Sequence, residues 1–447
     1  MIWGVLAGVI VLSSAPSEAF RFVVTGDTRG SDNGVNAVIL AEMTQAAIDD
    51  AADFIVVTGD LVNGSTDPAI LQSQLTTWRD TMQPLYDANI GVYPCRGNHD
   101  TGSKAAWDAV FTGSYALPGN GPGGEENVTY SFIHENSLFI ALDQYGLHLN
   151  RVNQAWLDTV LVSNLLPHVF IFGHVPAFSV YHADCLDDYP DERNLFWQSI
   201  VDGCGRIYFT GHDHYYNHAR IDDDDGNPDN DLHQIITGAG GAPMYDWNGR
   251  YSGDNGVWTP QLVFHEKQYS YILAEVNGLT VTLTMKHRTA PGTYEEAGDS
   301  MSFTYADTDG DSKGDTCDNC PAVANAAQED ADADRVGDGC DNCPADPNHT
   351  QADTLPPGGN GVGDACDCEG DFDGDADCDG TDVALFKADF GRSQLNTQCR
   401  SGYPCNGDFS CDGDVDGTDA VLIKADFGRD QLNHACPACV AGIWCGY

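Results

Sequence analysis

Five short turns in the sequence contain side chains that could together bind transition metals. Each turn has a glycine followed by a carboxylate, an amide or an imidazole, and in chain order they are Gly26-Asp27-Thr-Arg29-Gly, Gly59-Asp60-Leu-Val-Asn63-Gly, Gly97-Asn98-His99-Asp100, Gly173-His174-Val-Pro and Gly211-His212-Asp-His214. Glycine lets the backbone turn sharply, so that the next side chain can point into a site. Carboxylate, amide and imidazole ligands together suit ions such as Mn, Fe and Zn.

The chemistry expected of such a centre is the hydrolysis of a phosphate ester. A shared aspartate can bridge two ions roughly 3.5–4 Å apart, which is the separation used for phosphoryl displacement. Such an ion pair lowers the pKa of bound water and holds the attacking and leaving oxygens. Monoesters, diesters and nucleotides all remain open as substrates at this point.

The turns must be positioned by regular elements, and apolar segments typical of β-strands precede them. Strands are expected over residues 20–25, 53–58, 168–172, 206–210 and 233–237. Residues 35–50 have helical periodicity. The first two strands and this helix form a strand–helix–strand unit with an aspartate at each strand end, where α/β sheets place their ligands.

Five such turns in this order resemble the calcineurin-like metallophosphoesterase superfamily, which includes purple acid phosphatases. The resemblance covers about 280 residues and implies an α/β fold, a β-sandwich flanked by helices (αββα), over residues 20–303. It also implies a metal-dependent phosphohydrolase with two transition metals (Mn, Fe or Zn), in which a metal-bound hydroxide attacks the phosphoester.

The resemblance assigns six side chains as metal ligands. Asp60 would bridge both ions. The remaining ligands would be Asn98, His174 and His212 at one ion, and Asp27 and His214 at the other. His99 would bind no metal but would donate to the leaving group or stabilise the transition state, and Asp100 would orient His99.

Two positions depart from the family pattern. Arg29 stands where most of the superfamily has a histidine, and Asn63 stands where purple acid phosphatases have a tyrosine ligand. The ion at Asp27 therefore has three expected protein ligands. Arg29 stays charged and cannot ligate. It could hold the substrate phosphate bidentately or form a salt bridge with nearby acids, and both interpretations stay open.

Several other polar side chains and cysteines are expected to have structural roles. Asp143 is expected to support a turn, and residues 222–225 to form a solvated acidic turn or another calcium site. We expect a disulfide between Cys185 and Cys204, and a buried free thiol at Cys95. Four histidines lie outside the motifs and are not assigned: His182, His218, His233 and His265.

Residues 304–368 contain an acidic repeat with a spacing of 23 residues. Carboxylates at alternate positions converge on a hard cation when the chain curls. The expected calcium ligands are Asp307, Asp309, Asp311 and Asp315 in the first copy, and Asp330, Asp332, Asp334 and Asp338 in the second. With their regularly spaced cysteines, the copies resemble thrombospondin type 3 repeats. A third copy at 360–366 lacks the leading aspartates.

A second repeat, with a period of 37 residues, occupies residues 369–434, before a cysteine-rich tail at 435–447. Its loops place oxygen side chains as an EF-hand-type calcium loop requires. These residues are Asp371, Asp373, Asp375, Asp379 and Asp382, then Asp408, Ser410, Asp412, Asp416 and Asp419. One short helix after each loop resembles a dockerin module, whose partner would be a cohesin or cell-surface protein. Small calcium-binding, disulfide-rich modules are therefore expected to follow the α/β domain.

Charge, cysteines and the first residues limit the setting of the protein. The chain has 20 basic and 68 acidic side chains, a formal charge of −48, which argues against binding a nucleic-acid backbone. The 16 cysteines suggest an oxidising compartment. Residues 1–19 read as a secretory signal, with a first buried strand as the alternative. No other apolar run is long enough to span a membrane, so a secreted, extracellular or surface-associated protein is expected.

Two functions compete at this stage. The first is a secreted phosphohydrolase that is tethered or stiffened by its calcium-binding C-terminal region. The second is a catalytically inactive, calcium-dependent adhesion or scaffold protein, which the residues at Arg29 and Asn63 favour. The number of transition ions bound per chain separates the two.

Overall fold

The computed structural model describes residues 19–146, 149–228, 230–251, 257–354, 361–366, 378–393, 395–396, 407–408 and 412–428. The chain divides into two units, of which the first comprises Met1–Ala306 with Ser312–Cys317 and the second Asp307–Asp311 with Asp318–Tyr447. Residues 1–18 of the predicted signal segment lie outside the described part. Within the described residues, no helix has both the length and the apolar character that crossing a membrane requires.

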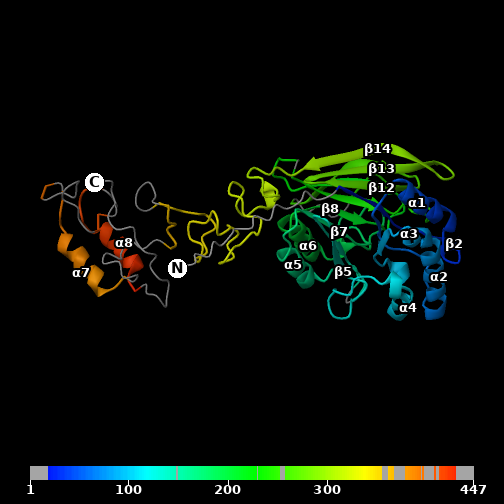
Figure 1. The fold of residues 1–447 in the computed structure, drawn as a ribbon, viewed down its shortest axis with the longest axis horizontal. Helices are drawn as coiled ribbons and strands as arrows, with labels where there is room; N and C mark the ends of the chain where they lie inside the picture. The colour runs from blue at the N-terminus through cyan, green and yellow to red at the C-terminus, as the bar shows by residue number, and fades with distance from the viewer. Residues whose placement is uncertain are drawn as a thin grey trace, which may run out of the picture. The chain divides into compact units, whose positions relative to one another are not determined.

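The first unit contains a six-stranded sheet, called sheet 1 (Figure 1). Its strands in spatial order are β14 (Thr293–Thr304), β13 (Thr280–Ala290), β12 (Ser270–Asn277), β1 (Phe20–Thr25), β3 (Phe54–Val57) and β4 (Gly91–Pro94). Strands β1, β3 and β4 are parallel, whereas β12 to β14 are antiparallel neighbours. The parallel strands therefore end at one common edge.

A seven-stranded sheet, called sheet 2, completes the pair. Its strands in spatial order are β11 (Thr259–Glu266), β9 (Tyr216–Asp222), β10 (Leu232–Thr237), β8 (Gly205–Thr210), β7 (His168–Phe172), β6 (Ser137–Ala141) and β5 (Tyr130–His134). Strands β6, β7, β8 and β10 are parallel. Sheet 2 thus also has a carboxyl edge to which loops can bring ligands.

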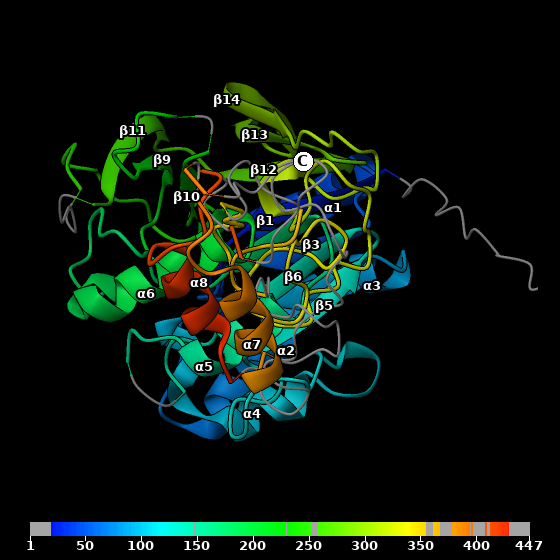
Figure 2. The same cartoon turned by 90° about the vertical axis from the view of Figure 1, so that its left-hand side faces the viewer.

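Helices cover the outer faces of both sheets. The first unit has α1 (Ala37–Asp49), α2 (Pro68–Thr81), α3 (Gln83–Asp87), α4 (Lys104–Val110), α5 (Gln154–Val162) and α6 (Pro190–Asp202), with short 3-10 turns at Asn98–Gly102, Gly113–Tyr115, Leu186–Asp188 and Asp315–Cys317 and an isolated strand β2 (Arg29–Asp32). Figures 1 and 2 show α5 and α6 on one side of the unit and α1 and α3 on the other. Asn36 and Asp67 accept hydrogen bonds from the first turns of α1 and α2, which fixes where these helices begin.

Phenylalanine rings fill the space between the two sheets. Phe22 of β1 stacks on Phe54 of β3 with ring centroids 5.2 Å apart. Across the interface, Phe22 meets Phe139 of β6 and Phe170 of β7, both at 5.1 Å. All four side chains are buried. These rings therefore hold the sheets face to face.

The predicted α/β class with a pair of sheets is confirmed. Strands β1 and β7 begin and end at the predicted residues, and β3, β8, β10 and α1 lie within one or two residues of the expected bounds. The agreement follows from strong local patterns, because short apolar runs bounded by glycine turns are typical of buried parallel strands.

The expected disulfide between Cys185 and Cys204 is wrong. Cys204 pairs with Cys317, with Cα atoms 5.8 Å apart, whereas Cys185 is a buried free thiol. Cys204 lies at the beginning of β8, while Asp184, the neighbour of Cys185, contacts His212 beyond the end of β8. A six-residue strand spans roughly 20 Å, far beyond the reach of a disulfide. The prediction of a buried free thiol at Cys95 is confirmed.

The described part of the second unit is built from turns, two disulfides and two short helices. The disulfides are Cys320–Cys340 and Cys343–Cys366, and the helices are α7 (Gly380–Asp389) and α8 (Asp419–Asp426). Each helix follows one of the predicted calcium loops. Within those loops, Asp371, Asp373, Asp375 and Ser410 lie outside the described residues, as does the tail at 435–447.

Replacing Phe139 by alanine should destabilise the first unit by about 3–5 kcal/mol, because it leaves a cavity between the sheets. Urea unfolding followed by tryptophan fluorescence measures this change in the free energy of unfolding. Ile133→Ala is the matched control, since Ile133 on β5 is 65% exposed and its loss should cost less than about 0.5 kcal/mol. Equal effects of the two changes would contradict the packing described here.

Candidate metal centre

All six predicted metal ligands lie in loops at the carboxyl edges of the two sheets. Sheet 1 contributes Asp27, Asp60 and Asn98, which follow β1, β3 and β4, and sheet 2 contributes His174, which follows β7, and His212 and His214, which follow β8. Because parallel strands end at the same edge, residues far apart in the sequence come together here.

The loop backbones adopt conformations that few residues tolerate. Asp27, Asp60 and His212 have positive φ angles of 55°, 50° and 72°. Such conformations are costly for residues other than glycine and concentrate at functional sites. Gly59, with φ 87°, cannot be replaced easily, because a Cβ atom there would lie 2.6 Å from Nδ1 of His174. The glycine of this motif thus permits both the turn and the close approach.

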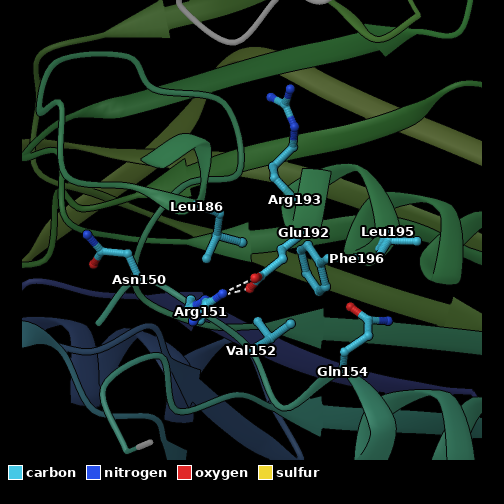
Figure 3. Close-up of a pocket in the computed structure, with 9 residues that line it drawn as sticks. All are labelled: Asn150, Arg151, Val152, Gln154, Leu186, Glu192, Arg193, Leu195 and Phe196. Atoms are coloured by element: carbon cyan, nitrogen blue, oxygen red, sulfur yellow. Dashed lines mark hydrogen bonds and ion pairs between the residues drawn. The ribbon is translucent and has the colours of Figure 1, made fainter. Parts of the chain in front are cut away.

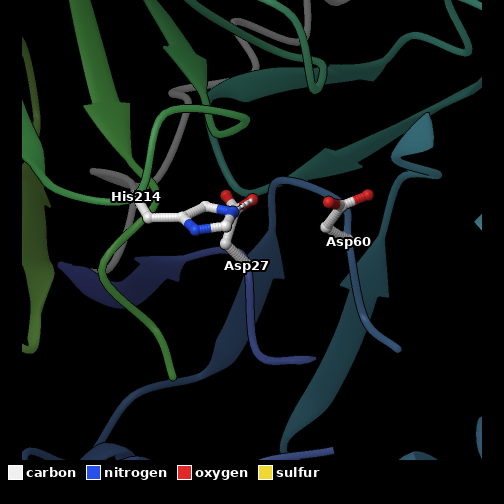
Figure 4. Close-up of side chains that lie close together, drawn as sticks. All are labelled: Asp27, Asp60 and His214. Carbon is white, nitrogen blue, oxygen red and sulfur yellow. Dashed lines mark ion pairs between the residues drawn. The ribbon is translucent and has the colours of Figure 1, made fainter. Parts of the chain in front are cut away.

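One group of ligand atoms is formed by Asp27, Asp60 and His214 (Figure 4). One ligand atom of each lies within 4.8 Å of the others, and all three residues are buried. His214 directs Nδ1 at the carbonyl oxygen of Pro243, 2.7 Å away, so this nitrogen donates and Nε2 of the neutral ring is an acceptor. Nε2 lies 3.4 Å from Oδ1 of Asp27, a buried oxygen without a hydrogen-bond partner among the described residues.

A second group surrounds His174. Its Nδ1 lies 2.8 Å from the carbonyl oxygen of Thr58, so its Nε2 is likewise an acceptor in the neutral ring. Within reach of this Nε2 are Oδ1 of Asn98 at 3.1 Å, Nδ1 of His212 at 3.3 Å and Oδ1 of Asp60 at 3.5 Å. Acceptors that face one another need a cation between them. Both groups therefore fit transition-metal ions, with Asp60 shared.

The protonation states agree with metal binding. Burial acts to raise the pKa of Asp27, but the neighbouring imidazoles outweigh it and lower this pKa below its usual value. Burial lowers the pKa of His174. An ionised carboxylate and a neutral imidazole are the forms that bind metal.

That Asp100 orients His99 stays a prediction, because no hydrogen bond joins the two side chains among the described residues. Nδ1 of His99 instead contacts the carbonyl oxygen of Asn63 at 2.7 Å. Asp100 accepts hydrogen bonds from the backbone of Gly97 at 2.8 Å and Leu61 at 3.1 Å. Burial, together with the charge of Asp60, raises the pKa of Asp100 to about 8. Asp100 thus connects the loop after β3 to the loop after β4 through hydrogen bonds from their backbone N–H groups.

Arg29 lies among the ligands. Its Nε is 3.5 Å from Oδ2 of Asp60, and its Nη2 is 3.2 Å from Nε2 of His214 and 3.5 Å from the hydroxyl of Tyr245. The side chain is 18% exposed. Arg29 therefore forms the expected salt bridge, with Asp60. Its side chain is also partly open to solvent.

The sequence motifs missed three side chains around His212. Oδ1 of Asp184 lies 3.4 Å from Nε2 of His212, and this contact raises the pKa of His212 although burial acts to lower it. The ring of His182 lies 4.5 Å from the ring of His212. Asp213 accepts from the backbone of Tyr181 and His182. Of the three, only Asp213 could have been found from the sequence, because it lies between the predicted metal ligands His212 and His214.

The remaining candidates have structural partners. Asp143, which was expected to support a turn, forms a buried ion pair with Arg96 at 2.5 Å. His218 bonds Asp299 and His233, both at 2.8 Å, and His265 packs against Tyr215. The three histidines and Asp299 lie on the strands β9, β10, β11 and β14, whereas Arg96 and Asp143 lie just after β4 and β6 at the carboxyl edges of the sheets.

Within the described residues, three acidic clusters lie outside the centre. In two of them one carboxylate oxygen of each residue lies within 4.8 Å of the others: Asp307, Asp309 and Asp311, and Asp330, Asp332 and Asp334. The copies also repeat a bond, since Asn325 donates to Asp311 and Asn348 to Asp334. The third cluster, at Asp222, Asp223 and Asp231, is bound by Arg220 through Asp231 at 2.8 Å.

A small hollow of about 80 Å³ lies between the beginnings of α5 and α6 (Figure 3). It is lined by Arg151, Leu186, Glu192 and Phe196 among others, and Arg151 forms an ion pair with Glu192. None of its nine lining residues is a candidate metal ligand. Pockets for small molecules are usually at least about 300 Å³, and this hollow is smaller and lies apart from the candidate ligands.

Residues 20–216 match the model of the calcineurin-like phosphoesterase family. This match covers less than half of the chain, and within it the chain is similar to calcineurin-like phosphoesterases. No curated protein matches the chain.

Several solved structures match part of this chain. A purple acid phosphatase from yellow lupin (Lupinus luteus) seeds is 16% identical, with a TM-score of 0.49, and the match covers 64% of this chain and 54% of that chain. A dimetal phosphatase from Danio rerio is 13% identical, with a TM-score of 0.42, over 65% of this chain and 100% of that chain. GAP50, the anchor in the inner membrane complex of Plasmodium, is 14% identical with a TM-score of 0.45, over 64% and 89%. The chain thus spans about half of the lupin protein.

His174→Ala should remove one transition ion per chain, because it deletes the acceptor around which the second group converges. Metal content is measured after loading with Mn in saturating calcium, which occupies acidic sites elsewhere. His287→Ala is the control, since His287 pairs with Glu266 at the surface. Unchanged manganese content in His174→Ala would contradict the proposed ligand set.

Proposed function

We propose that the first unit is a metal-dependent phosphohydrolase that cleaves phosphoester bonds with two transition ions, Mn, Fe or Zn. The observation that carries this proposal is the convergence of six ligand side chains whose acceptor atoms face one another, five of them buried and one, Asn98, exposed. When bound, the ions would supply an activated water and neutralise the charge of the phosphoryl oxygens. Asp60 would bridge them, since it takes part in both groups of ligand atoms.

His99 is suited to proton transfer at the leaving group. Its Nδ1 donates to the carbonyl oxygen of Asn63, which fixes the ring. Its Nε2 then faces the centre, 3.9 Å from Oδ2 of Asp60, and the side chain is 31% exposed. A positioned histidine of this kind can hold a proton at Nε2 and release it to the departing oxygen.

Arg29 would bind the phosphate. Its guanidinium lies beside Asp60 at the partly exposed side of the ligands. Arginine binds phosphate oxygens through two parallel N–H donors. Asp60 and His214 would orient this group before the substrate arrives.

The test is hydrolysis of p-nitrophenyl phosphate and bis-p-nitrophenyl phosphate by protein loaded with Mn, Fe or Zn. His212→Ala should abolish turnover, since it removes a ligand, while calcium uptake stays unchanged. His99→Ala should lower kcat by about 10²–10⁴-fold with the metal content intact. Two bound ions without turnover of any ester would instead favour the inactive adhesion or scaffold protein.

We further propose that the C-terminal region binds calcium, and that the protein is secreted and held in place by this region, with a cohesin-like or surface protein as partner. Support for calcium comes from the two aspartate clusters that repeat the same geometry. Support for secretion comes from the disulfides in the described residues, since disulfides persist in oxidising compartments.

Asp332→Asn should reduce calcium binding by one ion per chain, because it removes one carboxylate of the second cluster. Equilibrium dialysis with radioactive calcium measures the stoichiometry. Asp80→Asn is the control, since Asp80 is a largely exposed aspartate of α2 that pairs only with Arg79 among the contacts found. Equal calcium stoichiometry in both variants would contradict a site at this cluster.

A further inference from the structure

Three aromatic rings are stacked beside the metal centre. The ring of Tyr245 lies parallel to that of His214, with centroids 4.2 Å apart and an interplanar angle of 18°. Tyr181 stacks on Tyr245 at 4.8 Å and 12°. Tyr181 is nevertheless 48% exposed. The stack therefore begins at a metal ligand and ends at an aromatic ring that is open to solvent.

Asp213 fixes the backbone segment that carries the outer ring, that of Tyr181. This buried carboxylate accepts from the backbone N–H of Tyr181 at 2.8 Å and of His182 at 3.1 Å. It also contacts Nδ1 of His182 at 2.7 Å and the hydroxyl of Tyr215 at 3.2 Å. Because Asp213 stands between two metal ligands in sequence, the segment carrying Tyr181 is tied to the ligand loop.

The inner ring is fixed by polar contacts as well. Nη2 of Arg29 lies 3.5 Å from the hydroxyl of Tyr245. The ring of His182 meets Tyr181 at 5.0 Å and Tyr245 at 5.2 Å, in both cases edge to face. Tyr245 also packs against the buried side chains of Val180, Tyr215 and Ile236. Rigid, exposed aromatic rings bind partners at a low cost in conformational entropy.

We propose that Tyr181 stacks against a planar ring of the substrate, so that the enzyme prefers phosphate esters that carry an aryl group or a nucleobase. This inference rests on the proposed hydrolysis of phosphate esters, because Arg29 and the ions would hold the phosphate next to the stack. Aromatic rings attract one another in offset-stacked arrangements, and nucleobases stack on aromatic side chains whatever their sequence. Tyr181 would therefore determine specificity without taking part in bond cleavage.

Binding of phosphonates tests the subsite without turnover. Calorimetry with manganese-loaded protein compares phenylphosphonate with methylphosphonate, which differ in the ring alone. The wild type should bind phenylphosphonate about tenfold more tightly, Tyr181→Ala should lose this preference, and Tyr181→Phe should keep it. Methylphosphonate affinity should be the same in all three proteins. Tyr189→Ala is the matched control, since Tyr189 is 41% exposed but stacks on Arg151 instead.

Kinetics with three esters then identify the source of the ring. Phenyl phosphate, adenosine 5′-monophosphate and glycerol 2-phosphate are compared by kcat and KM. Tyr181→Ala should raise KM about tenfold for the ester that matches the natural ring, with kcat retained and glycerol 2-phosphate unaffected. A larger effect on the adenosine ester indicates a nucleobase, and a larger effect on the phenyl ester indicates an aryl group.

Failure of the inference and failure of the proposed function give different results. Equal affinity of the wild type for the two phosphonates, or an equal loss for both in Tyr181→Ala, would overturn the subsite. Absence of hydrolysis of all three esters, with the ring preference in binding intact, would instead overturn the hydrolase function and leave the subsite standing.

Discussion

Acceptor atoms that face one another at the carboxyl edges of two sheets are the constraint on which the first unit depends. Nε2 of His214 and Oδ1 of Asp27 lie 3.4 Å apart with no proton to share when the ring is neutral. A positive charge beside the two atoms stabilises this arrangement, because lone pairs repel one another in a buried, weakly screening environment. The Arg29 guanidinium, whose Nη2 lies 3.2 Å from Nε2 of His214, supplies one such charge, and a metal ion would supply another. The backbone carbonyl oxygens of Thr58 and Pro243 fix the histidines from behind, as second-shell groups commonly do for metal ligands.

The packed core between the sheets aligns the strand ends that carry the candidate ligands. Phe22 and Phe139 meet between the sheets, so the ends of β1 and β3 are aligned with those of β7 and β8. A displacement of one sheet against the other would separate Asp60 from His174. The well-packed phenylalanine layer resists it, since close-packed interiors transmit strain instead of absorbing it.

Two buried aspartates that belong to no metal-binding group connect the loops. Asp100 accepts from the backbone after β3 and after β4, and Asp213 accepts from the segment that carries Tyr181. A buried carboxyl group that accepts from several N–H groups fixes the backbone segments that donate to it. Placing these carboxylates inside the motifs makes the ligands, the proton donor and the stacked tyrosines parts of one rigid assembly.

The second unit is stabilised differently. Its described residues contain few large buried apolar side chains, and the disulfides Cys320–Cys340 and Cys343–Cys366 close its successive turns. Small modules of this kind need covalent or metal crosslinks because their hydrophobic cores are too small. The hydrogen bonds of Asp311 and Asp334 recur with the same partners in the two copies, so the repeat in sequence is a repeat in structure.

The bounds of five strands and the class of the fold follow from the sequence by itself, because apolar runs and glycine turns act over a few residues. The six candidate ligands are named in the sequence by the same glycine turns. The tertiary structure alone decided the partner of Cys204, the role of Asp100 and the surroundings of Arg29. Cys317, at a sequence separation of 113, lies beside Cys204, whereas the much nearer Cys185 is a full strand away. Likewise, no local pattern brings Tyr181 onto Tyr245. Side-chain partners across loops depend on where strands end in space, and that position is set by the packing of whole sheets.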